Sequence, residues 1–404
     1  MSNKGSKTSK RHCMVVHAYY PLGEVRVERE AQALIQAGYQ VDVICLRDEG
    51  EPAEEIVDGI KIYRMPVNRH RGKGSLMQMV EYLSFFFLAF FKLTGLHLSD
   101  RYNSIQVHNL PDFLVFAAIV PKLTGSKIIL DLHDLMPEFF AANYEKGMDS
   151  LPVRILILQE KLACAFADHV ITVTELWRQT LINRSAPASK VSVVMNVADR
   201  EVFDRNALPK LSPSTNGHFN LIYHGTITQR YGPDILLQAV NLLREDIPDI
   251  HVTIHGKGEF LDELKSLASD LKLGDHVGFS DQFVPTAELS QMILRSDVEV
   301  VPYRRNIFTD GILPTKLLEC VALGVPVIAS RTPAIEAYFD DSMVRYFTPG
   351  EVEELADCIR ELYQDRDKLA QIARNADRFN QEYSWSVLSA NYAALVDKLN
   401  KVDR

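Results

Sequence analysis

The stretch CMVVHAYYPLGEVRVEREAQALIQAGYQVDVICL, residues 13–46, decides the fold of this chain. It begins with a short apolar run, turns at Pro-Leu-Gly, continues with the spacing of an amphipathic helix and ends in a second β-rich run. Strand, loop, helix and strand in this order open a doubly wound parallel sheet. The stretch therefore predicts an α/β fold.

The same alternation continues along the chain and then occurs a second time. Strand-like runs recur at 60–67, 104–110, 127–134, 169–174 and 190–197, and again from 219 to 330 after the polar, proline-rich segment NALPKLSPSTNG. We expect two Rossmann-like doubly wound parallel-sheet domains, 1–203 and 218–384, joined by a linker at 204–217 and facing a cleft. An amphipathic helix over 385–404 ends the chain and is predicted to cross back to the first domain.

The composition is that of a globular protein, and its charge excludes one class of partner. Of 404 residues, 47% are hydrophobic and 24% charged, with a net charge of −9. Residues 201–404 hold 21 Lys and Arg against 31 Asp and Glu, which argues against a nucleic-acid binder because such proteins need a basic face. Five widely spaced cysteines and a polar start without an apolar signal core favour the cytoplasm.

Residues 76–98, LMQMVEYLSFFFLAFFKLTGLHL, form the most hydrophobic stretch. Their longest uncharged run is shorter than the ~20 apolar residues that a membrane-spanning helix needs. One interpretation is a core helix of the first domain. The other is a helix lying in the interface of an anionic membrane, favoured by six aromatic residues and by the basic residues just upstream.

A polar cluster follows the strand-like run KIIL in the first domain. Asp131, His133, Asp134 and Glu138 come from the segment DLHDLMPE, and His108 ends a neighbouring strand. Folding alone favours apolar residues there, so we expect a polar site for sugar hydroxyls or proton transfer. The same ligand types suit a metal, but their alternation places Asp131 and His133 on one strand face and Asp134 on the other, so we predict no metal. His108 suits a hydrogen-bonded structural role equally well.

Two strand-to-helix loops have the composition of anion sites. Gly23 in YPLGEVRVERE lets the backbone approach a ligand, although a glycine at this turn is common in doubly wound folds. In HGTITQRYG, Gly225 opens the turn, Thr226 and Thr228 offer hydroxyls, and Arg230 offers a guanidinium suited to phosphate. An exposed arginine without a ligand is the alternative.

The segment TDGILPTKLLECVALGVPVIAS, residues 309–330, is the most specific. Lys316 falls in the first turn of a predicted helix, where its charge opposes the helix dipole unless an anion is bound. Glu319 lies on the same helical face and suits ribose hydroxyls. A lysine–glutamate surface pair is the alternative.

At these residues the chain resembles family 4 of the retaining glycosyltransferases, which have the GT-B fold. The resemblance rests on five motifs in order: P-x-G-E-x-R-V-x-R-E-A, D-x-H-D-x-x-P-E, M-N-V-A-D-x-x-x-F, H-G-T-x-T-x-R-Y-G and L-P-x-K-L-x-E-x-x-A-x-G-x-P-V. It implies a nucleotide-diphosphate sugar held by the second domain, an acceptor held by the first, no cofactor and no required metal. By position, Arg230 and Lys316 would neutralise the diphosphate, Glu319 would bind the ribose, and backbone N–H groups near Leu317 and Gly23 would assist.

The resemblance also implies two reacting-centre residues and shows departures. His133 would contact the transferred sugar or the acceptor. The first glutamate of the family's Glu-x7-Glu motif falls at Gly311, so Asp310 beside it is the candidate replacement. Thr226 and Tyr231 stand where the family has an arginine and a lysine.

Together these features predict a cytoplasmic, retaining, metal-independent glycosyltransferase that moves a hexose-type sugar from a UDP or GDP donor. We expect a glycan or lipid-linked acceptor in polysaccharide biosynthesis, presented at the inner membrane face. A nucleotide-sugar epimerase of the same fold and a catalytically inactive partner subunit are the alternatives. A dinucleotide oxidoreductase lacks its glycine fingerprint here.

Overall fold

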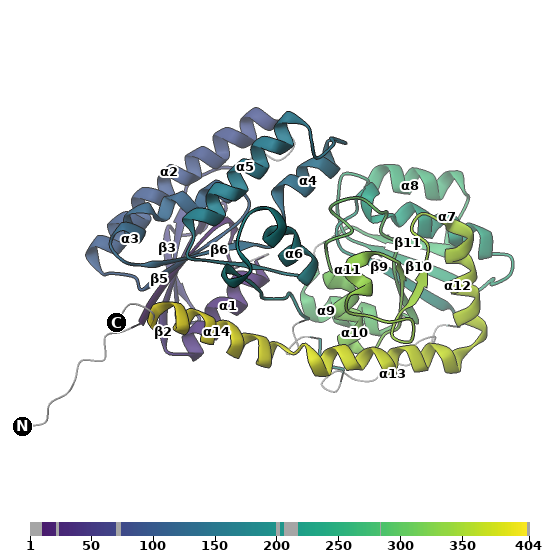
Figure 1. The fold of residues 1–404 in the computed structure, drawn as a ribbon. Helices are drawn as coiled ribbons and strands as arrows, with labels where there is room; N and C mark the ends of the chain where they lie inside the picture. Colours follow the sequence, from purple (N-terminus) through teal and green to yellow (C-terminus); the bar gives the residue numbers. More distant parts are fainter. Residues whose placement is uncertain are drawn as a thin grey trace, which may run out of the picture. The chain divides into compact units, whose positions relative to one another are not determined.

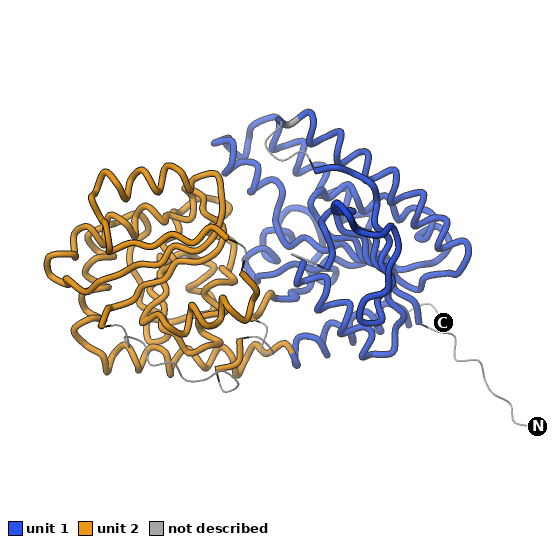
Figure 2. The backbone as a smooth tube through the Cα atoms, turned by 180° about the vertical axis from the view of Figure 1, so that it is seen from behind, with its two compact units in different colours: residues 1–195, 386–404 blue, residues 196–385 orange. Residues whose placement is uncertain are grey.

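A computed structural model describes residues 10–21, 24–69, 74–198, 203–205, 217–282 and 284–401. The chain divides into two compact units (Figure 2), residues 1–195 with 386–404 and residues 196–385. Most of the predicted linker, 206–216, lies outside the described residues.

Unit 1 is built on an eight-stranded sheet in which the strand order is β3-β4-β2-β1-β5-β6-β7-β8. Only β3 runs antiparallel to its neighbour. The central strands are buried on both faces because helices cover both sides, as continuous apolar runs predict. The strands are β1 (Lys10–Tyr19), β2 (Tyr39–Leu46), β3 (Glu54–Val57), β4 (Ile60–Met65), β5 (Ser104–His108), β6 (Lys127–Leu132), β7 (His169–Thr172) and β8 (Val191–Val193).

The helices of unit 1 form two layers (Figure 1). Helices α1 and α14 cover one face of the sheet, and α2, α3 and α5 cover the other. Helix α14 is fixed to the sheet by the Tyr392 hydroxyl, which donates to Gln106 Oε1 at 2.7 Å, and by Asp397, which accepts from Lys10 at 2.7 Å. The helices are α1 (Val25–Gln36), α2 (Ser75–Ser99), η1 (Asp112–Ala118), α3 (Ile119–Leu123), α4 (Met136–Asn143), α5 (Leu151–Phe166), α6 (Glu175–Arg184), η2 (Ala188–Lys190) and α14 (Trp385–Lys401).

Unit 2 has a six-stranded, fully parallel sheet in the order β11-β10-β9-β12-β13-β14. Its core packs the β9 and β10 side chains against α7 and α12. The strands are β9 (Phe219–His224), β10 (Ile250–His255), β11 (Val277–Ser280), β12 (Val298–Val301), β13 (Val327–Ser330) and β14 (Arg345–Phe347). The helices are η3 (Gln229–Tyr231), α7 (Pro233–Leu243), α8 (Leu261–Asp270), η4 (Gly274–His276), α9 (Thr286–Leu294), α10 (Thr315–Leu323), α11 (Pro333–Glu336), α12 (Val352–Gln364) and α13 (Arg366–Glu382).

The two doubly wound sheets confirm the predicted α/β fold class. Strands β3 and β14 were not predicted, because each has only three or four residues and β3 is largely exposed. All five cysteines are free and buried, as their wide spacing indicates.

Candidate active site

The strand order of unit 2 reverses at β9, which lies between β10 and β12. Ligands of open parallel sheets bind beyond the carboxyl ends of the strands at such a point. The loop after β9 carries Gly225 and Arg230, and α10, which follows β12, carries Lys316 and Glu319. The structure therefore gathers residues predicted from two distant segments at one edge of one sheet.

Lys316 is buried, and its ammonium lies against aromatic rings. Nζ is 3.7 Å from the ring centre of Tyr223, 5.7 Å from that of Tyr303 and 5.8 Å from that of Tyr231. Among the described residues it has no hydrogen-bond partner. Burial lowers the pKa of Lys316 to about 8, although the carboxylate of Glu299 acts in the opposite direction. A buried ammonium without an acceptor is costly, so this position favours an anionic ligand.

Arg230 reaches the same group of aromatic side chains. Its guanidinium carbon is 5.3 Å from the ring centre of Tyr231 and 5.7 Å from that of Phe308. Tyr231 in turn stacks on Tyr303 at 4.4 Å. The ring of Tyr231, which stands where the family has a lysine, is thus near both cations predicted for the diphosphate, Arg230 and Lys316.

His224 links two carboxylates at the end of β9. Its Nδ1 lies 3.1 Å from Glu299 on β12, and its Nε2 lies 2.8 Å from Glu319 on α10. Burial alone would lower the pKa of His224, but Glu299 and then Glu319 outweigh it and raise the pKa to about 9. At neutral pH both ring N–H groups therefore donate, and Glu319 is held in place with its side chain 21% exposed.

Two glycines allow the loops after β9 and β10 to come together. A Cβ on Gly256 would lie 1.8 Å from the carbonyl oxygen of Gly225. Gly225 itself has a φ of +107°, and a Cβ there would lie 3.5 Å from Lys316 Nζ. That spacing is an ordinary contact, so the positive φ, which L side chains rarely adopt, is what favours glycine at this position. Thr226, the next residue, is exposed.

Asp310 and Leu317 lie on either side of the start of α10. Asp310 pairs with the exposed guanidinium of Arg305 at 2.8 Å, which the sequence did not predict. The side chain of Leu317 is fully buried. Leu317 can therefore offer a ligand only its backbone N–H.

In unit 1 the predicted polar cluster is an ion-pair network. Arg26 on α1 donates to both oxygens of Asp131, at 2.7 and 3.1 Å, and His108 donates to Oδ2 at 2.9 Å. Asp131 and His108 are fully buried. Burial alone would raise the pKa of Asp131, but Arg26 and then His108 hold it below its ordinary value. Neither side chain is exposed to a ligand in this structure, which favours the structural role that the sequence analysis left open for His108, and the sugar contact expected of Asp131 stays a prediction.

A chain of hydrogen bonds fixes the tautomer of His108. The Gln106 amide donates to Glu30 at 2.6 Å and to His108 Nε2 at 3.3 Å, while Tyr392 donates to the Gln106 oxygen. His108 Nε2 accepts, so its proton is on Nδ1 and is directed at Asp131.

The other predicted residues of this cluster have different surroundings from one another. His133, just after β6, is partly exposed, and its Nδ1 lies 3.9 Å from Asp131. Asp134 is half-buried. Glu138 on α4 is buried and accepts from Arg184 at 2.5 and 2.9 Å, so its carboxylate is part of an ion pair, and its expected place on the sugar side stays a prediction. Gly23 lies outside the described residues.

In the described part of the chain, two groups of side chains have the ligand types of a metal site: His108, Asp131 and His133 in unit 1, and His224, Glu299 and Cys320 in unit 2. A cation of the protein already lies beside each carboxylate. Arg26 binds Asp131, and the imidazolium of His224 lies 3.1 Å from Glu299. A divalent ion would have to overcome this positive charge.

Arg26 and Glu299 were missed from the sequence. Each had a signal: Arg26 belongs to the quoted P-x-G-E-x-R-V motif, and Glu299 is a charged residue inside the apolar run VEVV. Their roles depend on partners far away in the chain. Asp131 is 105 residues from Arg26, and His224 is 75 residues from Glu299.

Comparison with known proteins agrees with this geometry. The family described as "Glycosyl transferases group 1" matches residues 204–379, and the "Glycosyl transferase 4-like domain" matches residues 23–196. Chitobiosyldiphosphodolichol beta-mannosyltransferase of Debaryomyces hansenii is 23% identical over 83% of this chain and 75% of its own length.

Two solved structures share the fold. Sucrose-phosphate synthase from Thermosynechococcus elongatus has a TM-score of 0.75 and 18% identity, covering 96% of this chain and 99% of that one. Anabaena HepE in complex with UDP-glucose has a TM-score of 0.71 and 18% identity, with the same coverage. The family matches and the mannosyltransferase relative favour a transferase over an epimerase. The chain belongs to the family 4 glycosyltransferases and has the GT-B fold.

Proposed function

We propose that this glycosyltransferase transfers a hexose from a nucleotide-diphosphate donor, without a divalent metal and with retention of the anomeric configuration. The observation that carries the proposal is the buried Lys316 ammonium, which has no hydrogen-bond partner among the described residues and lies at the switch point of the unit 2 sheet. A diphosphate is the anion that suits this position, since Arg230 lies over the same tyrosine ring.

In this proposal the donor lies along the start of α10. Lys316 and Arg230 bind the diphosphate, the N–H groups near Leu317 add to the positive field, and Glu319 binds the ribose hydroxyls. His224 orients Glu319 through the 2.8 Å hydrogen bond. The exposed Thr226 hydroxyl and the backbone at Gly225 form the wall of the pocket beside the diphosphate.

The main catalytic effect is stabilisation of the leaving diphosphate by these fixed positive charges. They take the place of the divalent ion that other diphosphate-leaving enzymes use. The released diphosphate oxygen accepts the proton of the acceptor hydroxyl, so attack occurs on the same face from which the leaving group departs. Asp310 is the candidate of unit 2 to contact the transferred sugar, and His133 is the candidate of unit 1 to contact the transferred sugar or the acceptor.

The acceptor proposed is a glycan or lipid-linked glycan at the cytoplasmic face of the membrane. The Debaryomyces relative is named for an acceptor on a dolichol diphosphate, and HepE was solved with UDP-glucose. UDP and GDP sugars are therefore the first donors to test.

Isothermal titration calorimetry with UDP, GDP, ADP and their sugars, in the presence of EDTA, tests the donor site. We expect one nucleotide to bind, with affinity lost in Arg230→Ala and Lys316→Ala and kept in Arg295→Ala, which removes an exposed cation at the end of α9. Unchanged affinity in the first two variants contradicts the proposal.

Turnover with a sugar donor separates the alternatives. The anomeric proton of the product, followed by NMR, is expected to keep the configuration of the donor, and an inverted product refutes retention. Release of free nucleotide in the absence of any acceptor would indicate an epimerase. Binding without turnover on any acceptor would indicate an inactive partner subunit.

A further inference from the structure

Helix α2 packs on unit 1 with one side and exposes the other. Phe85, Ala89 and Leu93 are fully buried, and Glu81 is buried with Oε1 3.1 Å from His17. By length and composition the helix is apolar enough to cross a membrane, yet only 22% of its apolar window is buried. Its exposed apolar residues are Leu76, Met77, Met79, Val80, Leu83, Phe87, Leu88, Phe91 and Leu98.

Helix α5 carries a second exposed apolar stripe. Leu151, Ile155, Leu158 and Leu162 are 71, 57, 56 and 53% exposed. Their spacing of four, three and four residues places them on one face of the helix. The sequence analysis did not identify this stripe, because α5 also has a buried face formed by Val153, Ala163 and Cys164 and therefore resembles an ordinary core helix.

The two helices belong to one surface. The 3-10 helix η1 connects them: Phe113 packs on Phe86 of α2 at 5.9 Å, and Phe116 packs on Phe166 of α5 at 5.1 Å. Figures 1 and 2 show α2 and α5 side by side on the same side of the sheet. We call the exposed apolar residues of α2 and α5 the α2–α5 face. Soluble proteins rarely expose contiguous apolar areas of this kind without a partner.

Within α2 and α5 the exposed charged residues are basic, although the exposed Asp100 follows α2 and the exposed Glu145 and Asp149 precede α5. Glu81 is buried and Lys92 pairs with Glu54, so the exposed residues of α2 in the described part carry no charge. On α5 the exposed charged residues are Arg154 and Lys161, whereas Glu160 is fully buried.

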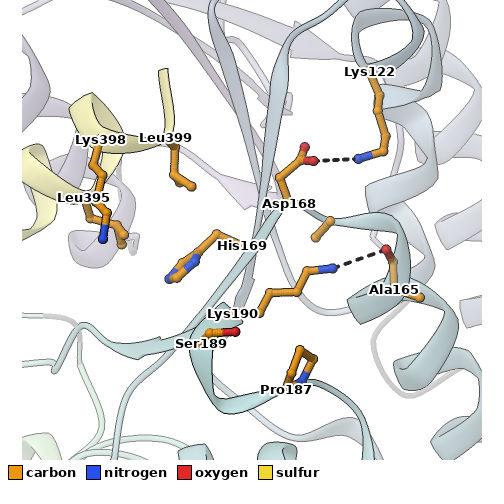
Figure 3. A pocket seen from close by; sticks show the side chains of 11 residues that line it. Lys122, Ala165, Asp168, His169, Pro187, Ser189, Lys190, Leu395, Lys398 and Leu399 are labelled. Atoms are coloured by element: carbon orange, nitrogen blue, oxygen red, sulfur yellow. Dashed lines mark hydrogen bonds and ion pairs between the residues drawn. The ribbon is translucent and has the colours of Figure 1, made fainter. Parts of the chain in front are cut away.

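A basic pocket lies beyond the end of α5 (Figure 3). Ala165, the next exposed residue of α5 after Leu162, lines a pocket of about 470 Å³ together with Lys122, Lys190 and Lys398. One carboxylate faces it, Asp168, which pairs with Lys122 at 3.0 Å. The apolar stripe of α5 therefore leads directly into a surface with net positive charge.

We infer that the α2–α5 face docks unit 1 on an anionic lipid bilayer, with α2 and α5 lying in the interface and Arg154 and Lys161 facing lipid phosphates. Helix α2 cannot leave the unit to cross the bilayer without exposing its packed side and the buried Glu81 to lipid. The inference goes beyond the proposed function, because docking requires neither donor nor acceptor.

The charge distribution favours lipid over a second copy of the chain. A twofold dimer through this face would bring Arg154 and Lys161 of each copy close to those of the other, and like charges oppose such a contact. An anionic bilayer instead attracts every one of these groups.

Vesicle flotation of the full chain is the test. Vesicles of phosphatidylcholine mixed with phosphatidylglycerol are expected to carry the protein to the top of the gradient, and phosphatidylcholine alone to carry less. Phe91→Gln on α2 and Leu158→Gln on α5 should each weaken binding about tenfold, whereas Leu242→Gln, an exposed leucine of α7, should not. Arg154→Gln with Lys161→Gln should weaken binding to the anionic vesicles about fivefold for each charge, and Arg374→Gln is the control.

Several outcomes overturn the inference. The first is that the protein is absent from the floating fraction at low salt, and the second is that Phe91→Gln and Leu158→Gln float as well as wild type. The third is that the wild type does not float but forms a dimer in solution, which these two variants convert to a monomer. A chain that resists alkaline carbonate extraction from cell membranes would refute the interfacial placement of α2. Nucleotide affinity measured on the same variants shows that unit 2 is folded and keeps this test separate from that of the proposed function.

Discussion

Replacement of Lys316 provides the sharpest prediction of the donor site. In the unliganded protein its pKa is lowered to about 8, chiefly by burial. Lowering a lysine pKa from 10.5 to about 8 corresponds to ~3 kcal/mol of bias against the ammonium. A bound diphosphate supplies the missing acceptors, so it favours the ammonium and raises this pKa.

The pH dependence of nucleotide affinity follows with a definite sign. Below pH 8 the ammonium is already present, and affinity is at its plateau. Above pH 8 the free site holds a neutral amine that must take up a proton on binding, so affinity falls about tenfold per pH unit. Lys316→Arg keeps its charge at every such pH and should show a shallower fall. Lys316→Met should bind about 10- to 150-fold more weakly at pH 7, the loss of a charge-assisted hydrogen bond.

Calorimetry with UDP or GDP at pH 7, 8 and 9, in buffers of different ionisation enthalpy, measures both affinity and proton uptake. The arginine variant is the matched control because His224, which also titrates near pH 9, is present in both proteins. Equal pH slopes for wild type and Lys316→Arg, or no proton uptake in wild type, would refute the reasoning.

Three further predictions concern the supporting residues. His224 has a raised pKa of about 9, so its charged form stabilises the fold fully below pH 6.5, and this effect is lost as the pH rises to 9. The free energy of unfolding in urea should therefore differ by ~3 kcal/mol between wild type and His224→Gln at low pH, and this difference should close by pH 9. A difference that stays constant over that range would contradict the prediction. Arg26→Ala leaves the buried Asp131 carboxylate without its cationic partner, with only His108 still donating to it, and should cost ~3–5 kcal/mol of unfolding free energy at pH 7; a loss below ~1 kcal/mol would show that the network is unimportant. Gly256→Ala places a Cβ 1.8 Å from the Gly225 oxygen and should lower nucleotide affinity measured by calorimetry, whereas unchanged affinity would show that the loops tolerate separation.

Local patterns in the sequence predict most of the fold. The run KIILDLHD predicts a strand, and β6 occupies Lys127–Leu132, with His133 just beyond its end. The antiparallel edge strand β3 was not predicted, because EEIV is short and exposed and therefore lacks the apolar run of a buried parallel strand. Gly23 lies outside the described residues, so the anion site predicted there stays a prediction.

The candidate site could be predicted only where its residues are close together in the sequence. Lys316 and Glu319 are three residues apart on one helix, so local periodicity suffices to place them together. The partners of Glu319 do not follow from local sequence, because His224 meets it only through the pairing of β9 with β12. Asp131 shows most clearly what residue type alone cannot predict. An aspartate at a strand end suggested a ligand contact, but Arg26, 105 residues earlier in the chain, donates to both of its oxygens.

A crystal structure of the chain grown with UDP or GDP would test the central claim most directly. The account predicts diphosphate oxygens within hydrogen-bond distance of Lys316 Nζ and the Arg230 guanidinium, with ribose hydroxyls at the Glu319 carboxylate. A nucleotide bound elsewhere, with the Lys316 ammonium still without an acceptor, would contradict it.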